Sequence, residues 1–401
     1  MKLSDLKIAV GHDDLTVPYA GGEKVFMAIA ETFPKADIFT SMITDQWRSR
    51  LPDRKIITTF MQGFPLKRKL QKPLFALYPL AFESLDLSDY DLVVSSSSRF
   101  AHGVITRPET KHVCYMHSPG RMFWEPDRYF GSNSRLKSLL APILSYLRLW
   151  DHTAAQRVDQ FVANSRNIAN KIKRYYGRDA EAVYPFVDLQ RFTPQVVNSE
   201  SLMVNGSKKQ LTINHKPLTS GDYFLVVTRL APWKRTEIAV EAAKQAGVKL
   251  KVVGIGPDEK RLRALVKSKS ESKSKIEILG GVGDEELVGL FQNCSALIMT
   301  QEEDFGITSL EAQACGRPVI AYSRGGALEN VIPGKTGEFF DSQDSEALAK
   351  VLNKFDPKRY RAEDCRKNAE RFSKERFQKE IIEAVKRVVK DGSLREPSFN
   401  G

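Results

Sequence analysis

The sequence is poor in cysteine and has no long apolar segment. Its 401 residues include four cysteines, none in a C-x-x-C spacing, so neither a zinc site nor a disulfide framework is predicted. Such cysteine usage favours a reduced, cytoplasmic setting. No stretch approaches the roughly 20 apolar residues of a membrane span. Residues 1–5 lack the apolar core of a signal peptide. We therefore expect a cytoplasmic chain that is at most peripheral on the inner membrane face.

Acidic residues are outnumbered by basic ones. The formal net charge is +12, and residues 1–195 already contain 27 Lys and Arg against 20 Asp and Glu. A mild excess spread over both halves suits an acidic partner such as a nucleotide diphosphate, an anionic lipid or a nucleic acid. No helix-turn-helix, zinc or RNA-binding motif supports the last of these, so no nucleic-acid partner is predicted.

Short apolar runs alternate with helical patterns over most of the chain. One series starts at residues 7–10 and a second at residues 223–227, and the segment 196–222 between them is rich in Ser, Asn, Lys and Gly. This order predicts an α/β fold with two doubly wound, Rossmann-like domains, 1–195 and 223–370, joined by a linker at 196–222. An amphipathic pattern over 371–390 predicts a last helix.

The stretch 296–332 is the most informative part of the sequence. It reads as a strand at 296–299, a polar loop, a helix from about Thr308 to Gly316, and a second strand at 319–322. The loop follows the carboxyl end of its strand, where open α/β sheets bind ligands. Unpaired amides at the start of the helix form a ready anion site.

Two acids, Glu303 and Glu311, frame this loop eight positions apart. A carboxylate can accept hydrogen bonds from paired sugar hydroxyls. Thr308 and Glu311 also fit a capping box, in which Glu311 only satisfies the helix N-terminus. Both interpretations of Glu311 stay open at this point.

Further candidates follow other predicted strands. Arg229 and Lys234 come after the strand at 223–227 and can grip a diphosphate, although two solvated surface cations are the plain alternative. The pair Gly21-Gly22 lets the backbone approach a ligand at a helix start. His117 follows the strand at 113–116 and can donate to a sugar hydroxyl or a phosphate.

Together these motifs resemble retaining glycosyltransferases of the GT-B fold, family 4 type, over most of the chain. Residues 303–311 match their E-x7-E motif, and residues 117–125 resemble the H-[ST]-P-x-R-x-x-W-[DE] stretch of O-antigen mannosyltransferase-like members. Arg229 and Lys234 match the G-R-L-x-x-x-K-G stretch, with Thr228 in place of its glycine. Gly281 stands where many members have Arg, which weakens any inference about base contacts.

The resemblance implies two domains that face a central cleft, with the last helix crossing back to the first domain. It implies an N-terminal acceptor domain and a C-terminal donor domain for a nucleotide diphosphate sugar. It places His117 and Glu303 at the catalytic centre. The donor-binding set is Gly21, Gly22, Arg229, Lys234, Gly254, Val282, Phe305, Gly306, Ile307, Thr308 and Glu311, and the set near the acceptor or sugar is Asp13, Arg121 and Trp124.

The implied reaction moves a hexose to a glycan or a polyprenyl-diphosphate-linked acceptor in polysaccharide assembly, and GDP-mannose is the favoured donor. Neither a metal nor another cofactor is expected. The one D-x-D pattern, residues 89–91, precedes its strand, whereas a ligand site should follow the carboxyl end. A UDP-sugar enzyme, a GT-B phosphorylase or epimerase, and a basic nucleic-acid binding protein are the alternatives.

Residues 60–82 have a composition unlike that of the rest of the sequence. They contain four cations, many large apolar side chains and no acid. Basic residues interleaved with aromatics suit an anionic membrane surface. A core helix with a solvated basic edge explains the pattern equally well.

Overall fold

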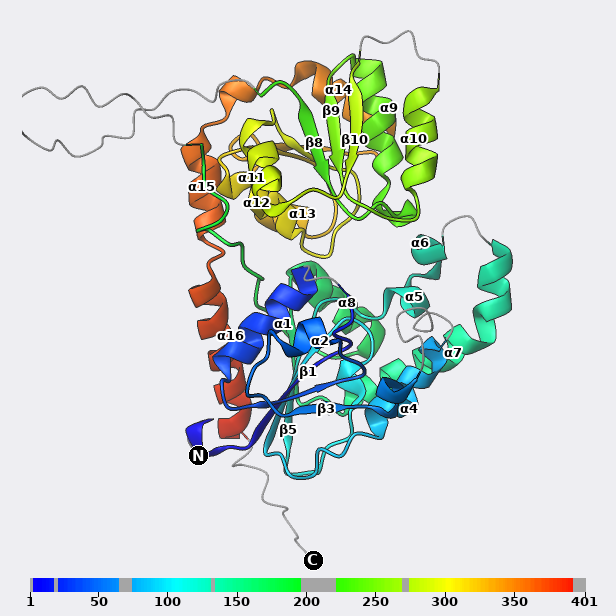
Figure 1. The fold of residues 1–401 in the computed structure, drawn as a ribbon, viewed down its shortest axis with the longest axis vertical. Coiled ribbons are helices and arrows are strands. Elements are labelled where there is room, and N and C mark those ends of the chain that lie inside the picture. The colour runs from blue at the N-terminus through cyan, green and yellow to red at the C-terminus, as the bar shows by residue number, and fades with distance from the viewer. Residues whose placement is uncertain are drawn as a thin grey trace, which may run out of the picture. The chain divides into compact units, whose positions relative to one another are not determined.

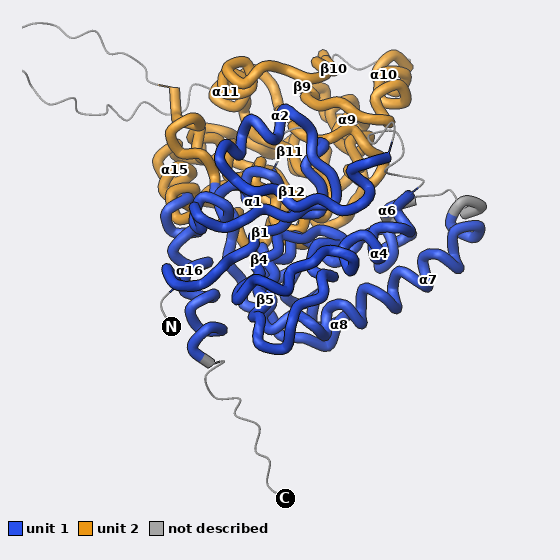
Figure 2. Tube along the Cα trace, turned by 60° about the horizontal axis from the view of Figure 1, so that its bottom comes forward, with its two compact units in different colours: residues 1–186, 374–401 blue, residues 187–373 orange. Residues whose placement is uncertain are grey.

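The computed structural model describes residues 3–17, 21–64, 74–130, 134–195, 221–268 and 274–391. The chain divides into two compact units, which Figure 2 shows in two colours. Unit 1 comprises residues 1–186 and 374–401, and unit 2 comprises residues 187–373.

Unit 1 is built on a parallel sheet of seven strands in the order β3-β2-β1-β4-β5-β6-β7 (Figure 1). Its strands are β1 (Ile8–His12), β2 (Asp37–Thr40), β3 (Ile56–Thr58), β4 (Leu92–Ser97), β5 (Lys111–Met116), β6 (Gln160–Ala163) and β7 (Ala180–Ala182). The central strands are apolar and buried, as in a sheet covered on both faces. The order reverses between β1 and β4, so the carboxyl ends of these two strands flank the switch point where such sheets bind ligands.

Parallel strands need crossover connections, and helices supply most of them here. The helices of unit 1 are α1 (Gly21–Thr32), α2 (Asp45–Arg48), α4 (Tyr78–Glu83), α5 (Arg121–Trp124), α6 (Pro126–Phe130), α7 (Ser134–Gln156), α8 (Arg166–Tyr176) and α16 (Lys374–Asp391). The bounds of helix α8 follow from its ends, because the Ser165 side chain caps its start and Gly177 ends it in the left-handed conformation.

The last helix, α16, belongs to unit 1, as the resemblance predicts. It packs on α1, where Gln378 donates a hydrogen bond to the Ala28 carbonyl and Lys374 pairs with Glu31. Its Phe377 ring meets Tyr115 of β5 edge to face. The chain therefore leaves unit 1 after residue 186 and returns to it at residue 374.

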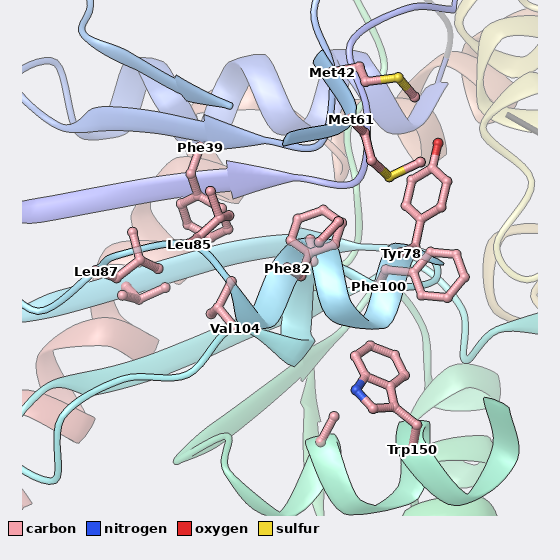
Figure 3. Close-up of a cluster of buried hydrophobic side chains, with 14 of the residues drawn as sticks. Phe39, Met42, Met61, Tyr78, Phe82, Leu85, Leu87, Phe100, Val104 and Trp150 are labelled. Atoms are coloured by element: carbon pink, nitrogen blue, oxygen red, sulfur yellow. The ribbon is translucent and has the colours of Figure 1, made fainter. Parts of the chain in front are cut away.

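Much of the segment 60–82 lies in the hydrophobic core of unit 1. Met61, Tyr78 and Phe82 are buried in a cluster that also contains Phe100 and Trp150 (Figure 3). The short 3₁₀ turns η2 (Phe60–Gly63) and η3 (Phe75–Leu77) lead into α4. The buried rings cannot contact a membrane, but Phe60 and Leu80 are exposed, so membrane contact through this segment stays a prediction. The four cations of the segment, Lys67, Arg68, Lys69 and Lys72, lie outside the described residues.

Unit 2 repeats the same plan on a parallel sheet of six strands in the order β10-β9-β8-β11-β12-β13. Its strands are β8 (Phe224–Val227), β9 (Leu250–Val253), β10 (Ile276–Gly280), β11 (Leu297–Met299), β12 (Val319–Tyr322) and β13 (Gly337–Phe340). Its helices are α9 (Thr236–Ala246), α10 (Glu259–Lys267), α11 (Asp284–Asn293), α12 (Ile307–Ala314), α13 (Ala327–Asn330), α14 (Ser345–Lys354) and α15 (Ala362–Glu370). The switch point lies between β8 and β11.

The unit boundary falls at residues 186/187 rather than at 195, and α16 starts at Lys374 rather than at 371. The amide of Val187 donates to the Phe372 carbonyl, and the Arg366 guanidinium donates to the carbonyls of Leu189 and Phe192. These bonds fix residues 187–192 to unit 2. The two Rossmann-like domains of the predicted fold are confirmed, and the cleft between them stays a prediction.

Candidate functional site

In unit 1 the switch point is occupied by the side chains of His12 and Ser96. His12 is the last residue of β1, and Ser96 lies near the end of the neighbouring β4, directly opposite it in the sheet register. The Nδ1 atom of His12 lies 2.9 Å from the Ser96 carbonyl oxygen and 3.2 Å from its hydroxyl oxygen. A carbonyl oxygen only accepts hydrogen bonds, so Nδ1 of His12 carries a proton.

The opposite ring nitrogen of His12 faces a carboxylate. Its Nε2 lies 3.9 Å from Oε1 of Glu23, in the first turn of α1, and both side chains are largely buried. Burial alone would lower the pKa of His12, but the hydrogen bond and the charge of Glu23 outweigh it, so the pKa is raised. Burial would likewise raise the pKa of Glu23, but His12 lowers it. The two side chains thus favour an imidazolium–carboxylate pair.

His117 joins this cluster through the Ser96 hydroxyl. It follows β5, and its Nε2 lies 2.8 Å from Oγ of Ser96. The hydroxyl can accept from Nδ1–H of His12 while it donates to Nε2 of His117. That arrangement places the proton of a neutral His117 ring on Nδ1.

The predicted glycine pair opens α1 beside this cluster. Gly21 and Gly22 are its first two residues, and a Cβ at position 22 would lie 3.9 Å from Cε1 of His117. The start of α1 therefore passes close to the imidazole, as a ligand site at a helix N-terminus requires.

Asp13 has a structural role in the described contacts. Its Oδ1 accepts from the amides of Phe100 and Ala101, and its Oδ2 accepts from the amide of Ser98. Burial alone would raise the pKa of Asp13, but the Arg99 charge and the loop amides lower it. The carboxylate thus holds the loop after β4, and its place near the acceptor or sugar stays a prediction.

Trp124 is also held by protein contacts. Its indole donates to Oδ2 of the buried Asp151 at 2.6 Å, and its ring stacks on Tyr175 at 4.7 Å. Trp124 is thus held in place while half-buried, and its place near the acceptor stays a prediction. Arg121 is the first residue of α5 and half-buried, and its place near the acceptor stays a prediction.

In unit 2 the switch point is occupied by an ion pair between two predicted site residues. Lys234 ends a 3₁₀ turn, η5 (Pro232–Lys234), after β8, and Glu303 follows β11. Nζ of Lys234 lies 2.5 Å from Oε1 of Glu303, which also accepts from the Gln301 amide at 2.5 Å. Both partners keep somewhat less than a fifth of their side-chain surface exposed. The sequence motifs therefore converge on one place in unit 2.

Two glycines hold the backbone of this loop. Glu303 forms a bridge with Gly325, and its carbonyl accepts from the Gly326 amide at 2.8 Å. A Cβ at position 325 would lie 2.3 Å from the Glu303 carbonyl oxygen, and one at 326 would lie 2.3 Å from Cα of Phe305. Side chains at either position would push the loop away, so the Gly-Gly pair sets the position of Glu303.

Helix α12 begins one residue earlier than predicted. Its N-cap is Gly306, at φ +89°, and Thr308 lies inside the helix without a capping bond. The capping box of Thr308 and Glu311 is therefore wrong. Glu311 is buried in the second turn of the helix. Ile307 and Thr308, in its half-buried first turn, stay candidates for donor contacts.

The remaining donor-binding candidates differ in their burial and in their contacts. Phe305 is buried, and its ring packs on Phe372 at 5.6 Å, so it is a core residue. Gly254 lets two backbone loops meet, since a Cβ there would lie 1.8 Å from the Thr228 carbonyl oxygen. Val282 is half-buried. The side chain of Arg229 is exposed and makes no hydrogen bond or ion pair with a described residue.

Three residues of the unit 1 cluster escaped the sequence reasoning. His12 comes two residues after the predicted strand at 7–10, Ser96 lies in a run of serines near the end of β4, and Glu23 reads as an ordinary acid in a first helical turn. A polar residue at the carboxyl ends of two strands that flank a switch point is the signal that would have found them. Recognising this signal requires the order of the strands in the sheet, and the sequence alone does not give that order.

Three other properties of the described residues limit what the protein can hold or cross. Among the described residues no group of three or more His, Cys, Asp or Glu side chains could hold a metal ion. The four cysteines are free and buried. Within the described part of the chain, no helix combines the length and the apolar character needed to cross a membrane.

Two family models match most of the chain. The model described as "Glycosyltransferase Family 4" matches residues 19–191, and the model described as "Glycosyl transferases group 1" matches residues 208–372. The two matches correspond closely to the two units.

Named relatives agree with these matches. An uncharacterized glycosyltransferase of Methanocaldococcus jannaschii is 28% identical over 198 residues, which cover 48% of this chain and 54% of that protein. A D-inositol 3-phosphate glycosyltransferase of Streptomyces scabiei is 30% identical over 220 residues, which cover 49% and 46%. The chain thus spans about half the length of these relatives. The Alpha-1,3/1,6-mannosyltransferase ALG2 of Dictyostelium discoideum is 26% identical over 314 residues, which cover 71% and 70%.

Solved structures share the fold. Sucrose-phosphate synthase from Thermosynechococcus elongatus superposes with a TM-score of 0.68 at 16% identity, covering 96% of this chain and all of that one. Anabaena Alr3699/HepE in complex with UDP superposes with a TM-score of 0.63 at 19% identity, covering 95% and 99%. With the family models and the two switch points, these findings lead to one conclusion: the chain belongs to the glycosyltransferases of the GT-B fold, family 4 type.

Proposed function

We propose that this protein transfers a hexose from a nucleotide diphosphate sugar to an acceptor, with retention at the anomeric carbon. Unit 2 binds the donor and unit 1 binds the acceptor. The observation that carries the proposal is the Lys234–Glu303 pair at the switch point of unit 2, because it joins a diphosphate-binding cation to a carboxylate that can accept from sugar hydroxyls.

The reaction needs a stabilised leaving group. Negative charge develops on the diphosphate as the glycosidic bond to it breaks, and Lys234, Arg229 and the amides at the start of α12 supply positive charge and donors. The side chain of Arg229 is exposed and makes no described polar contact, so it is available to a phosphate. Lys234 turns from Glu303 toward the diphosphate when the donor binds, which leaves the Glu303 carboxylate to accept from the sugar.

His117 is proposed to lie over the donor sugar with its Nδ1 protonated. The family resemblance implies departure of the leaving group from the face that the acceptor attacks, with the leaving phosphate helping to deprotonate the acceptor hydroxyl. No covalent nucleophile is invoked. The bond to the phosphate oxygen breaks as the bond to the acceptor oxygen forms, and the acceptor proton moves to the phosphate.

The proposal includes no metal. Lys234 and Arg229 take the place that a divalent cation would have at the diphosphate. Transfer is expected to persist in excess EDTA, measured as initial rate with a labelled donor. A complete loss that Mn²⁺ restores would overturn this part of the proposal.

GDP-mannose is the proposed donor. Residues 117–125 resemble mannosyltransferase-like members, and one named relative is a mannosyltransferase. A UDP-sugar is the second candidate, because the HepE structure carries UDP. A thermal-shift screen with GDP, UDP and ADP and their sugars decides, since a ligand stabilises the folded state according to its affinity. A larger shift with a UDP-sugar than with GDP-mannose would reverse the order.

The acceptor is proposed to be a glycan or a polyprenyl-diphosphate-linked sugar on the cytoplasmic side of the membrane. Turnover of donor without acceptor, or turnover that depends on inorganic phosphate, would point instead to an epimerase or a phosphorylase of the same fold. Product analysis with and without acceptor separates these outcomes.

A further inference from the structure

His117 is held from both neighbouring strands of the unit 1 sheet. It follows β5, and its amide donates to the carbonyl oxygen of Ser97 in β4 at 2.8 Å. Its own carbonyl oxygen accepts from Nδ2 of Asn164, which follows β6, at 2.9 Å. Its ring nitrogen Nε2 contacts the Ser96 hydroxyl, as described above. The backbone and the ring of this residue are therefore fixed by separate contacts.

Asn164 extends the pairing of β5 and β6 by one residue. Met116 and Ala163 are the last partners in the register of these strands, and the amide of Asn164 donates to the Met116 carbonyl at 3.2 Å. The chain then enters α8, so β6 ends before it reaches the His117 carbonyl. The side-chain amide of Asn164 supplies the donor at this position instead of a strand amide.

The start of α8 fixes the orientation of the Asn164 side chain. Its Oδ1 accepts from the Ser165 hydroxyl at 3.0 Å, so Nδ2 is the atom that faces His117. The Ser165 hydroxyl also accepts from the Ile168 amide and thereby caps α8. Asn164 and Ser165 are 7% and 0% exposed, so little water competes for the His117 carbonyl.

The segment after His117 depends on such contacts for its shape. Helix α5 has four residues, and its N-cap makes no side-chain hydrogen bond. Helices this short are not stable on their own. The far end of the segment is fastened by Glu125, whose Oε1 lies 2.6 Å from Nζ of Lys171 in α8. Asn164 is the corresponding anchor at the start of the segment.

We infer that Asn164 is a positioning residue for sugar transfer, because it sets the backbone of His117 and thereby the place of the imidazole. The inference rests on the proposed function, since Asn164 acts only through His117. A displacement of about 1 Å caused by a change away from the reacting atoms can slow an enzyme about a hundredfold. The role therefore predicts a loss of turnover without a loss of nucleotide binding.

Two substitutions of Asn164 test the role of its amide. In Asn164→Asp the side chain keeps its shape, but an ionised carboxylate only accepts hydrogen bonds. The kcat for transfer from labelled GDP-mannose should fall about tenfold to a hundredfold, while KM for the donor and the nucleotide-induced thermal shift keep their wild-type values. Asn164→Ala removes the donor without adding a charge and should lower kcat in the same way, so it replaces the first variant if that one does not fold.

Thr110→Val is the matched control. Thr110 precedes β5 at the opposite edge of the sheet, is 3% exposed, and donates from its hydroxyl to the Tyr90 carbonyl at 2.6 Å. This variant loses one buried hydrogen bond of unit 1, as the Asn164 variants do. It should therefore lower the melting temperature to a similar extent and keep the wild-type kcat.

The carbonyl group of His117 reports the contact directly. His117 and Ser118 form the only His-Ser pair in the sequence, so labelling with ¹³C-carbonyl histidine and ¹⁵N-serine gives a single correlation peak. The carbon signal should move upfield in Asn164→Ala, because the carbonyl loses a hydrogen bond, and should stay in place in Thr110→Val. The measurement needs no substrate, so failure of this inference and failure of the proposed function can be told apart.

Three results would overturn the inference. An unchanged carbonyl signal in Asn164→Ala would show that the amide does not hold His117. A changed signal with wild-type kcat in both Asn164 variants would make Asn164 a structural residue only. An equal loss of kcat in Thr110→Val would show that the rate follows the stability of unit 1 and not the position of His117.

Discussion

The two units place similar chemistry at the same point of the same fold. In unit 1 the pair is His12 and Glu23, and in unit 2 it is Lys234 and Glu303. His12 ends β1 and Lys234 follows β8, the first strand of each unit along the chain. The unit 1 pair is the more deeply enclosed, with side-chain exposures of 5% and 14% against 18% and 17%. It also contains an imidazole, whose charge depends on pH.

The two pairs differ in how firmly they are fixed to the surrounding protein, which points to a different role for each. The His12–Glu23 pair is fixed to the backbone of β4 and to His117 through Ser96, so it positions another side chain. The Lys234–Glu303 pair is partly open to solvent, and each partner suits a different portion of a sugar nucleotide. We therefore propose that the unit 1 pair supports the site and that the unit 2 pair contacts the ligand, and the following variants test this division.

Lys234→Ala should have the largest effect. It removes a group that stabilises charge on the leaving diphosphate, so kcat should fall about a hundredfold to a thousandfold. Initial rates with a labelled donor provide the measurement. Lys267→Ala, which removes an exposed cation of α10 in the same unit, should keep the wild-type rate. A rate within a few-fold of wild type for Lys234→Ala would reduce the pair to a surface ion pair.

Glu311→Gln should weaken binding of free nucleotide by roughly 1.5–3 kcal/mol, the scale of a hydrogen bond to a charged group. A carboxylate can accept from both ribose hydroxyls, whereas an amide offers one acceptor oxygen. The melting temperature should stay nearly unchanged, because α12 does not use Glu311 as a cap. Calorimetric titration without sugar excludes effects at Glu303. Wild-type affinity in the variant would remove Glu311 from the site.

Glu23→Gln should lower the stability of unit 1 by about 1–3 kcal/mol, in a pH-dependent manner. The pKa of His12 is raised, so its contribution is complete below its ordinary value of 6.5 and is lost as pH rises through the folded value. The pKa of Glu23 is lowered, so its contribution is complete above 4.5 and is lost as pH falls through the folded value. The difference from wild type should therefore be largest between pH 4.5 and 6.5.

Thermal unfolding at a series of pH values measures this difference. A constant offset from wild type across the whole pH range would show that the pair does not change its protonation. The corresponding variant of unit 2, Glu303→Gln, lacks an imidazole partner and should show no such window near neutral pH.

Ser96→Ala should have the smallest effect, about a tenfold decrease in kcat, the equivalent of one hydrogen bond. Without the hydroxyl, Nε2 of His117 loses the donor that fixes its tautomer. The ¹⁵N shifts of His117 should then report a mixture of tautomers, while nucleotide affinity in unit 2 stays constant. Ser98→Ala on the same loop is the matched control. An unchanged His117 spectrum would contradict the positioning role.

The elements of the fold were largely predictable. Buried parallel strands read as short apolar runs, so β12 was found with its bounds and β5 and β11 nearly so. Predicted starts of α12 and α16 were off by one to three residues. In α12 the cap is a glycine in the left-handed conformation, which leaves no side-chain signal.

The functional site was only partly predictable from the sequence. Lys234 and Glu303 lie in motifs on separate strands, and their convergence follows from parallel strand order. Phe305 and Trp124 also lie within motifs, yet Phe305 is buried against Phe372, and Trp124 is half-buried and stacks on Tyr175. A motif records which residues recur together, and only three-dimensional contacts separate those that meet a ligand from those that hold the loop.

The return of the chain to unit 1 has a consequence for how the protein is made. A ribosome releases the seven strands of unit 1 first, but α16, which packs on α1 and β5, is synthesised after the whole of unit 2. Unit 2 is continuous in sequence and can fold as it emerges, since domains generally fold as units. Unit 1 must wait, with the surface around Tyr115 uncovered until Phe377 arrives. The half of the protein that is translated first is therefore the half that is finished last.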